Sequence, residues 1–197
     1  MNEILNDAGL DLLFRGARTL RAWHDRPVTD VVLRALYDLL RLAPTSFNSS
    51  PGRIVFVRSP EGKKRLMPAL TESNRKQTMA APVTAIIGHD LRFYEYLPRL
   101  NTANPNAKDL FEGKTEVAAV NAFRNGSLQG GYLILAARAL GLDCGPMSGF
   151  DNAAVDKEFF PAGRVKSNFL CNLGYGDRTD IRPRAARLDF DEACKVV

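Results

Sequence analysis

The feature that most constrains the fold is a long helical pattern that ends in a glycine-rich segment. Apolar residues recur at helical spacing over residues 115–140, and the run Cys144-Gly145-Pro146-Met147-Ser148-Gly149-Phe150-Asp151 follows shortly after. The run predicts a rigid backbone turn, which either merely reverses the chain or lets peptide N–H groups approach a flat ligand at Gly149. Inside the helix, Gly130 and Gly131 each cost about 1 kcal/mol relative to alanine. They indicate either simple tolerance or the close approach of another backbone, such as a second subunit's helix.

Apolar runs alternate with helical patterns along the chain, which favours one sheet flanked by helices. Three runs predict buried strands, at residues 53–58, 83–88 and 168–175. The segment 91–114 contains two prolines and is expected to be an irregular excursion or lid. We therefore expect a single α+β domain, an α/β sandwich, over residues 1–197. Further helices are expected over residues 3–14, 29–43, 60–69 and 151–159.

The composition argues against several classes of protein. With 45% hydrophobic and 25% charged residues, the chain matches an ordinary globular protein. No apolar stretch reaches the ~18 residues of a membrane span, and the acidic start lacks the features of a secretory signal, so the cytoplasm is the expected location. The net charge of +5 comes from scattered basic residues, which does not favour nucleic-acid binding. A local excess near the C-terminus could hold a phosphate, bind nucleic acid or be solvated; it comprises Arg178, Arg182, Arg184 and Arg187.

The cysteines and histidines indicate neither a metal site nor a hydrolase. The three cysteines are far apart and form no Cys-x-x-Cys pair. Neither His24 nor His89 lies beside a nucleophile motif, and a capping or surface role is expected for His89. The motifs of a Rossmann dinucleotide site and of a P-loop are also missing. We therefore expect no catalytic side chain and no metal, and infer that a bound group carries the chemistry.

Two further polar clusters accompany the Pro146–Gly149 segment. In Arg18-Thr19-Leu20-Arg21, two guanidinium groups three residues apart could point the same way on one helical turn and bind a phosphate. The alternative is a solvated turn. The loop Pro44-Thr45-Ser46-Phe47-Asn48 offers hydroxyls and an amide, which suit a heterocycle edge that alternates carbonyl and N–H groups. Its alternative is an exposed loop without a ligand.

Over nearly the whole chain, these clusters resemble those of the nitroreductase family of FMN-dependent oxidoreductases. Arg18-Thr19-x-Arg21-x-Trp23 is similar to that family's phosphate motif, Ala43-Pro44-Thr45-Ser46-x-Asn48-x-x-Pro51 to its Ala-Pro-Ser-x-x-Asn-x-x-Pro loop, and Gly145–Asp151 to its flavin-face segment. More narrowly, segments 122–125, 146–151, 166–168 and 174–177 resemble the malonic semialdehyde reductase (3-hydroxypropionate dehydrogenase) branch. Two departures are Ser148, where nitro-reducing members commonly carry glutamate, and Gly52, where tryptophan is usual.

The resemblance implies a nitroreductase-like central sheet flanked by helices, in a domain-entwined homodimer that binds FMN at each subunit interface. It assigns the phosphate contacts to Arg18, Thr19 and Arg21, with Arg184 or Arg187 as helpers. Asn74 would meet the ring or the ribityl chain. One face of the flavin would be covered by Pro146, Met147, Ser148 and Gly149, while the partner subunit would contribute Pro44, Thr45, Ser46 and Asn48.

The implied activity is the reduction of malonic semialdehyde to 3-hydroxypropionate in pyrimidine degradation, with NADPH or NADH as co-substrate. FMN would carry the hydride. Arg124 and Arg53 are candidates to bind the substrate carboxylate, because each lies beside apolar residues; a structural ion pair is the alternative for either. A broad-specificity nitro or quinone reductase on the same fold stays open. A small-molecule substrate is expected, and neither nucleic acid nor a membrane is expected as a partner.

Overall fold

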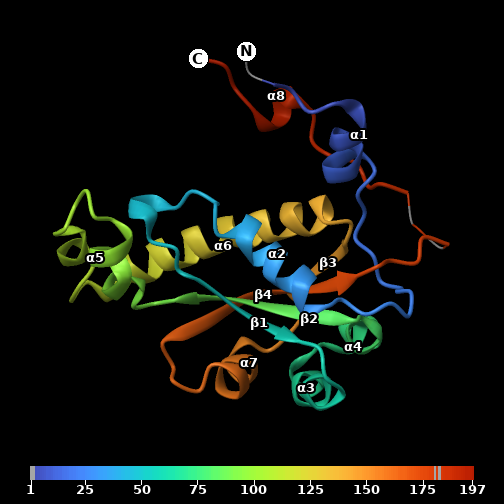
Figure 1. Cartoon of the computed structure of the whole chain (residues 1–197), viewed down its shortest axis with the longest axis horizontal. Helices are drawn as coiled ribbons and strands as arrows, with labels where there is room; N and C mark the ends of the chain where they lie inside the picture. Colours follow the sequence, from blue (N-terminus) through green and yellow to red (C-terminus); the bar gives the residue numbers. More distant parts are fainter. Residues whose placement is uncertain (1–2, 180, 182) are drawn as a thin grey trace.

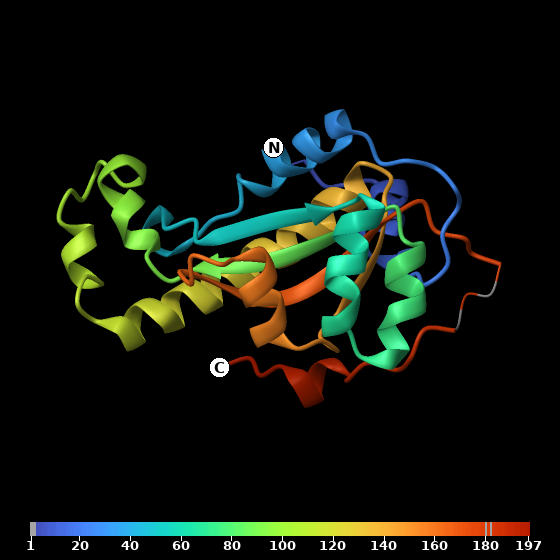
Figure 2. The same ribbon diagram turned by 90° about the horizontal axis from the view of Figure 1, so that it is seen from below.

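The computed structural model describes residues 3–179, 181 and 183–197, so Arg182 lies outside the described residues. At its centre is a four-stranded sheet with the order β1-β2-β4-β3, in which neighbouring strands are antiparallel. Helices cover both faces of the sheet (Figure 1, Figure 2), which confirms the expected α+β sandwich. The strands are β1 (Gly52–Val57), β2 (Val83–Asp90), β3 (Asp143–Met147) and β4 (Val165–Gly174).

Strand β3 corrects the expectation that the glycine-rich run is a turn. Residues Asp143–Met147 pair with β4, from Asp143 opposite Gly174 to Met147 opposite Leu170. Pro146 is compatible with this pairing because β3 is the last strand of the sheet, and an edge strand tolerates a residue without an N–H donor. The turn follows the strand, at Ser148 and Gly149.

One face of the sheet is covered by α2 (Asp30–Leu40) and the long helix α6 (Thr115–Ala139). The hydroxyl of Thr29 caps α2 by accepting a hydrogen bond from the Val32 N–H at 3.4 Å, as the sequence predicts. Buried residues of both helices meet the sheet in one apolar cluster. Its members include Leu36, Leu40, Leu133, Ala137, Val83, Ile87, Cys171 and Leu173.

The opposite face is covered by α3 (Pro60–Leu66), a 3-10 turn η3 (Met67–Ala69), α4 (Glu72–Ala80) and α7 (Asn152–Phe159) (Figure 1). Asp151 caps α7, since its carboxylate accepts a hydrogen bond from the Ala154 N–H at 3.1 Å. The sequence did not predict α4, whose residues are almost all polar. This second apolar cluster contains Leu66, Leu70, Ile86, Val155 and Leu170.

Residues 91–114 form a compact extension with its own apolar core, so the expectation of an irregular segment was wrong. They contain the short helices η4 (Phe93–Tyr96), α5 (Leu97–Leu100) and η5 (Ala107–Leu110). The rings of Phe93 and Phe111 are both buried and meet edge to face, with their centroids 5.0 Å apart. This core rests on the first turns of α6.

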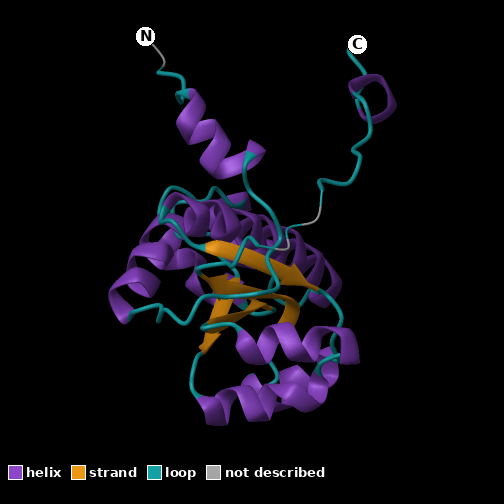
Figure 3. Ribbon diagram, turned by 90° about the vertical axis from the view of Figure 1, so that its right-hand side faces the viewer, coloured by secondary structure: helices purple, strands orange, loops and turns teal. Residues whose placement is uncertain are grey.

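Both ends of the chain extend away from the sheet (Figure 3). The N-terminal helix α1 (Asp7–Leu10) continues into a π-helical turn, η1 (Asp11–Arg15), and the C-terminal tail carries α8 (Phe190–Ala193). None of these three elements has a buried residue, and the apolar side chains of Leu12 and Phe14 are each 50% exposed. Among the described residues, no helix has both the length and the apolar character that crossing a membrane would take.

The two neighbouring glycines of α6 predict opposite effects of substitution by alanine. A Cβ at Gly130 would lie 2.5 Å from the ring of Phe169, whereas a Cβ at Gly131 would have no neighbouring atom within 4 Å. We expect Gly130→Ala to lower the free energy of unfolding by about 1–3 kcal/mol through overpacking. Gly131→Ala should raise it by up to about 1 kcal/mol through helix propensity. Urea titration of both variants measures the difference; destabilisation by Gly131→Ala would instead indicate that another backbone packs at that position.

Candidate functional site

Residues 17–23 lie in an extended conformation along the outer edge of β3. The Leu20 N–H donates to the Cys144 carbonyl at 3.1 Å, and Thr19 forms a parallel bridge with Cys144. The expectation of a helical turn at Arg18 and Arg21 was therefore wrong. Gly145 permits this contact, because a Cβ there would lie 2.7 Å from the carbonyl oxygen of Leu20. The fold thus brings the Arg18–Arg21 segment into contact with the strand that leads into the Pro146–Gly149 segment.

Positive charges gather where this segment meets the C-terminal tail. Arg18 donates to the carbonyls of Arg15 and Ala17 at 3.0 and 2.9 Å, and Arg184 donates to the same two carbonyls at 2.8 and 2.9 Å. The pKa of Arg184 is lowered, first by desolvation and then by the positive charges of Arg18, Arg187 and Arg138. Four arginines therefore form this cationic cluster: Arg18, Arg138, Arg184 and Arg187.

An anion would relieve this concentration of charge. Among the residues that the structure describes, no ion pair links Arg18, Arg184 or Arg187 to a carboxylate. The Nε of Arg18 is buried and has no hydrogen-bond partner within the described part of the chain. Guanidinium groups donate to phosphate oxygens in this way. The donors present therefore fit the phosphate of FMN, and of the two tail arginines expected as helpers, Arg184 is the one that shares carbonyl acceptors with Arg18.

Asn74 and Gly149 form a second part of the site. The Asn74 side-chain amide donates to the Gly149 carbonyl at 3.0 Å, and the backbone N–H and hydroxyl of Thr71 donate to it at 3.0 and 2.9 Å. A Cβ on Gly149 would lie 2.5 Å from the Asn74 nitrogen. Because Gly149 has no side chain, α4 can pack directly against this segment. The segment Pro146–Gly149 and helix α4 together form one wall, and its strand β3 is the one that Thr19 contacts.

The loop with Pro44, Thr45, Ser46 and Asn48 is held in a strained conformation. Its short helix η2 (Ser46–Asn48) includes Phe47 at φ 56°, and Asn48 and Ser50 have φ values of 52° and 40°. The Ser46 N–H donates to Asn125 at 2.8 Å, and the Asn48 side chain donates to the Leu100 carbonyl at 2.7 Å. Such strain persists where surrounding contacts hold it, and it is frequent at ligand sites.

This loop lies at the other end of the sheet from the arginines. It leads into Gly52, which pairs with His89, whereas Gly145 pairs with Asn172 and hence lies in line with Thr84. Thr84 and His89 are five residues apart on β2, a separation of ~17 Å at the rise of a strand. Within one chain, the structure therefore does not bring the Pro44–Asn48 loop together with Arg18.

The two arginines considered for substrate binding differ in their surroundings. Arg53 donates to Asp90 at 2.8 Å, and Arg164 donates to the same buried carboxylate at 2.8 Å. Hydrogen bonding to Asp90 raises the pKa of Arg164 above its usual value. These contacts favour the structural ion pair as the role of Arg53. Arg124 is exposed on α6 beside Phe123, whose side chain is 54% exposed.

Two polar residues, His89 and Lys63, are buried, although neither burial was predicted from the sequence. His89 was expected near the surface, but it is buried on β2 against the edge of the Phe123 ring, and burial lowers the pKa of its imidazole. Lys63 is also buried, on α3. The burial of Lys63 could have been inferred from the sequence. Lys63 precedes Leu66 by three residues and Leu70 by seven, the spacing of one apolar helix face.

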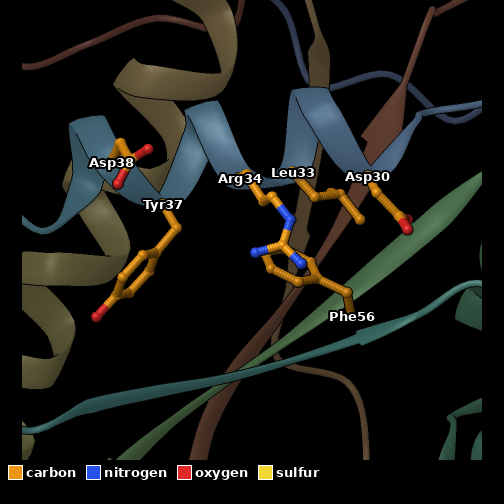
Figure 4. A pocket seen from close by; sticks show the side chains of 6 residues that line it. All are labelled: Asp30, Leu33, Arg34, Tyr37, Asp38 and Phe56. Carbon is orange, nitrogen blue, oxygen red and sulfur yellow. The ribbon is translucent and has the colours of Figure 1, made fainter.

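A hollow of about 410 Å³ lies between α2 and β1 (Figure 4). Its wall contains none of the residues predicted to bind the cofactor. The hollow is open to solvent. It lies against β1, which is the strand farthest from β3 in the sheet. We therefore do not assign it to the cofactor. The lining residues are Asp30, Leu33, Arg34, Tyr37, Asp38 and Phe56.

Comparison with known proteins agrees with the fold and identifies the family of the chain. A protein from Xanthomonas oryzae pv. oryzae, provisionally named NADH dehydrogenase/NAD(P)H nitroreductase, is 57% identical over 195 residues. The matched residues are 99% of this chain and 99% of that protein. One of the same provisional name from Cupriavidus pinatubonensis is 56% identical over 189 residues, which are 95% of this chain and 96% of that one. A provisionally named nitroreductase from Exiguobacterium sibiricum, solved in complex with FMN, has the same fold, with a TM-score of 0.82 over 100% of both chains at 18% identity. The sequence profile of the Nitroreductase family matches residues 14–175, and the chain belongs to this family.

Proposed function

We propose that the protein is an oxidoreductase that uses FMN, with NADPH or NADH as co-substrate. The observation that carries the proposal is the group of Arg18, Arg184 and Arg187 at the edge of β3. A phosphate dianion suits this cluster, because it would neutralise like charges that have no carboxylate partner among the described residues. Bound FMN would supply the two-electron chemistry between a nicotinamide and the substrate, which the side chains of this chain do not provide.

The other site residues follow from this placement of the phosphate. Thr19 and Arg21 are exposed and follow Arg18 in sequence, and the sequence motif is the support for them as further donors to the phosphate. Asn74 and the segment from Pro146 to Gly149, with Met147 and Ser148 between them, would line the ring. Because Asn74 already holds Gly149, these residues form a wall before any ligand binds.

A second copy of the chain would complete the site, in a domain-entwined homodimer. A single chain leaves the Pro44–Asn48 loop at the far end of the sheet and leaves one edge of β1 without a paired strand among the described residues. It also exposes many large apolar side chains on the terminal segments and on one side of α6, more than a monomer commonly shows. They include Leu12, Phe14, Val117, Val120, Phe123, Leu128, Leu188 and Phe190.

Mixing two defective variants tests this shared site. We expect Arg18→Ala and Asn48→Ala each to lose most activity as homodimers. If each site takes Arg18 from one subunit and Asn48 from the other, a mixed dimer holds one intact site and one doubly altered site. Random exchange should then restore about a quarter of the wild-type activity, since half of the dimers are mixed. Turnover that stays at the level of the two homodimers would show that both residues act within one subunit.

For the substrate, we propose malonic semialdehyde, reduced to 3-hydroxypropionate in pyrimidine degradation. The support is the resemblance of the Arg124 and Ser148 segments to that branch of the family, together with the exposed cation at Arg124. The alternative is a broad-specificity nitro or quinone reductase on the same fold. The provisional names of the relatives favour that alternative.

Arg124→Ala separates a carboxylate contact from a general role. If Arg124 binds the substrate carboxylate, its loss should raise KM for malonic semialdehyde by about tenfold or more, the usual effect of removing a charge-assisted hydrogen bond. The KM for an uncharged quinone should not change. Arg53→Ala provides the comparison, because Arg53 is paired with Asp90 and its loss should affect both substrates equally. An equal loss for both substrates with Arg124→Ala would exclude the assignment.

A direct assay tests the proposed function as a whole. The purified protein should bind FMN in a ratio of one per chain and should oxidise NADPH or NADH only when an acceptor is present. Steady-state rates with malonic semialdehyde, a quinone and a nitroarene rank the acceptors. Failure to bind FMN under any reconstitution condition would overturn the proposal, whereas a preference for the quinone would support the alternative substrate.

A further inference from the structure

Lys63 occupies an unusual environment for a lysine. Its side chain extends from α3 into the space beneath the sheet, and the residue is 4% exposed. The ammonium nitrogen donates to the Thr78 carbonyl at 2.7 Å and to the Thr84 hydroxyl at 2.6 Å. Among the described residues, no carboxylate forms an ion pair with it. A buried amine without a counter-charge is costly, which calls for an explanation.

From Lys63, a chain of hydrogen bonds runs to β3. The Thr84 hydroxyl donates to the Asn172 side-chain oxygen at 2.7 Å, and the Asn172 amide donates to the Thr78 hydroxyl at 3.3 Å. That hydroxyl donates in turn to the Met147 sulfur at 3.4 Å. The side chains of Thr84, Asn172 and Thr78 each accept one bond and donate the next, so the directions are consistent from the Lys63 ammonium to the Met147 sulfur. Thr78, Thr84 and Asn172 are all fully buried.

The chain joins the two parts of the proposed flavin wall at their base. Thr78 belongs to α4, which also carries Asn74, and Met147 is followed by the turn that contains Gly149. Asn74 connects the two parts at one level by donating to Gly149. The bond from Thr78 to Met147 connects them at a second level. Lys63 fixes Thr78 through its carbonyl and orients the rest of the chain through Thr84.

An apolar side chain would fill the space of Lys63 at a lower cost. Burial lowers the pKa of Lys63 from 10.5 to about 7, so the folded protein bears a penalty for this amine at neutral pH. Methionine would avoid that penalty but would leave the Thr78 carbonyl and the Thr84 hydroxyl without their donor. The advantage of lysine at this position therefore lies in the two hydrogen bonds that it donates.

We propose that Lys63 is a positioning residue for the flavin, which sets the spacing between α4 and the Met147–Gly149 segment through the chain Thr84–Asn172–Thr78–Met147. The inference rests on the proposed use of FMN. Lys63 does not touch the ligand in this proposal. It affects the affinity for the ring indirectly, because residues that contact a ligand keep their geometry only when the residues behind them hold them in place.

Three variants test the role of Lys63. Lys63→Met removes the donor, and Thr78→Val cuts the chain between Asn172 and Met147 while it keeps the Thr78 carbonyl. Lys64→Met changes the exposed neighbouring lysine on the same helix and serves as the control. The dissociation constants of FMN and riboflavin are measured for each apo-protein by quenching of flavin fluorescence. Amide hydrogen exchange is measured over residues 72–80 and 147–149 in the absence of flavin.

The expected result distinguishes the wall from the phosphate cluster. Lys63→Met and Thr78→Val should weaken FMN and riboflavin by the same factor, up to about tenfold, because the ring contacts change and the phosphate contacts do not. Exchange should become faster in both measured segments, and Lys64→Met should resemble the wild type in every measurement. Thr78→Val also guards against the loss of folding in Lys63→Met, because it leaves the lysine in place.

Other results would overturn the proposal. Unchanged affinities for both flavins in Lys63→Met and Thr78→Val would exclude a positioning role and leave the proposed function standing, provided that the wild type binds FMN. A loss confined to FMN would assign the effect to the phosphate cluster. A wild-type protein that binds neither flavin would refute the proposed function and this inference together.

Discussion

Arg18→Ala is expected to release FMN from the protein. The Arg18 side chain is half-buried beside β3 and is held by the Arg15 and Ala17 carbonyls, so its charge is already positioned for a phosphate. The loss of a charge-assisted hydrogen bond to a phosphate should weaken binding by about tenfold to a hundredfold. The dissociation constant of FMN, obtained by titrating the apo-protein and following flavin fluorescence, measures the change.

Riboflavin provides the control for this prediction, because it lacks the phosphate. Arg18→Ala should leave the affinity for riboflavin close to that of the wild type. Arg41→Ala removes an exposed arginine that directly follows α2 and pairs with Asp38 at 3.9 Å, and it should change neither affinity. If riboflavin loses as much affinity as FMN in Arg18→Ala, the side chain supports the fold of the segment and does not bind phosphate.

The stability of the apo-protein should rise as the pH increases from 7 to about 10 because of Lys63. The pKa of Lys63 is about 7 in the folded protein and 10.5 as the ordinary value. Between these values the unfolded chain holds a proton that the folded chain has lost, so a higher pH favours the folded state. The full difference corresponds to at most about 5 kcal/mol. Below pH 7 the penalty is complete and no longer varies.

Urea titrations at several pH values measure this effect through the difference between two variants. The free energy of unfolding of wild type minus that of Lys63→Met should increase with pH from 7 to 10, since other titrating groups cancel in the difference. Wild type minus Lys64→Met should stay nearly constant over the same range, because Lys64 is exposed. A flat difference for Lys63→Met would mean that the buried amine stays charged in the folded protein.

The elements with a strong apolar pattern could be predicted from the sequence, and those without one could not. Thr29 marked the start of α2 and Asp151 the start of α7, and both caps are present. Helix α4 was missed because its stability comes from polar contacts such as that of Asn74, which leave no periodic stripe. Strand β3 was taken for a turn because Gly145 and Pro146 disfavour a strand in isolation. At this edge both residues are useful, since Gly145 admits Leu20.

The site residues stay a prediction, whereas their spatial arrangement could be compared with the structure. The sequence motif identified Arg18 and suggested a tail arginine, and the structure joins Arg18 with Arg184. Spacing alone suggested a helical turn at Arg18, but pairing with β3 is a long-range contact that local spacing does not reveal. The hydrogen-bond network of Lys63 and Asn172 was missed for the same reason, because it connects residues of α3, α4, β2, β3 and β4.

The bond between Arg184 and the backbone near Ala17 has a consequence for how the protein matures. Its donor and acceptors are 167 to 170 residues apart, so it closes almost the entire chain into a ring. Such a closure carries a large entropic cost and follows the contacts within the sheet, which span shorter segments. A nascent chain still attached to the ribosome before residue 184 emerges lacks a cation of the cluster. Flavin loading is therefore expected only after residue 184 is available, later than the pairing of the sheet strands.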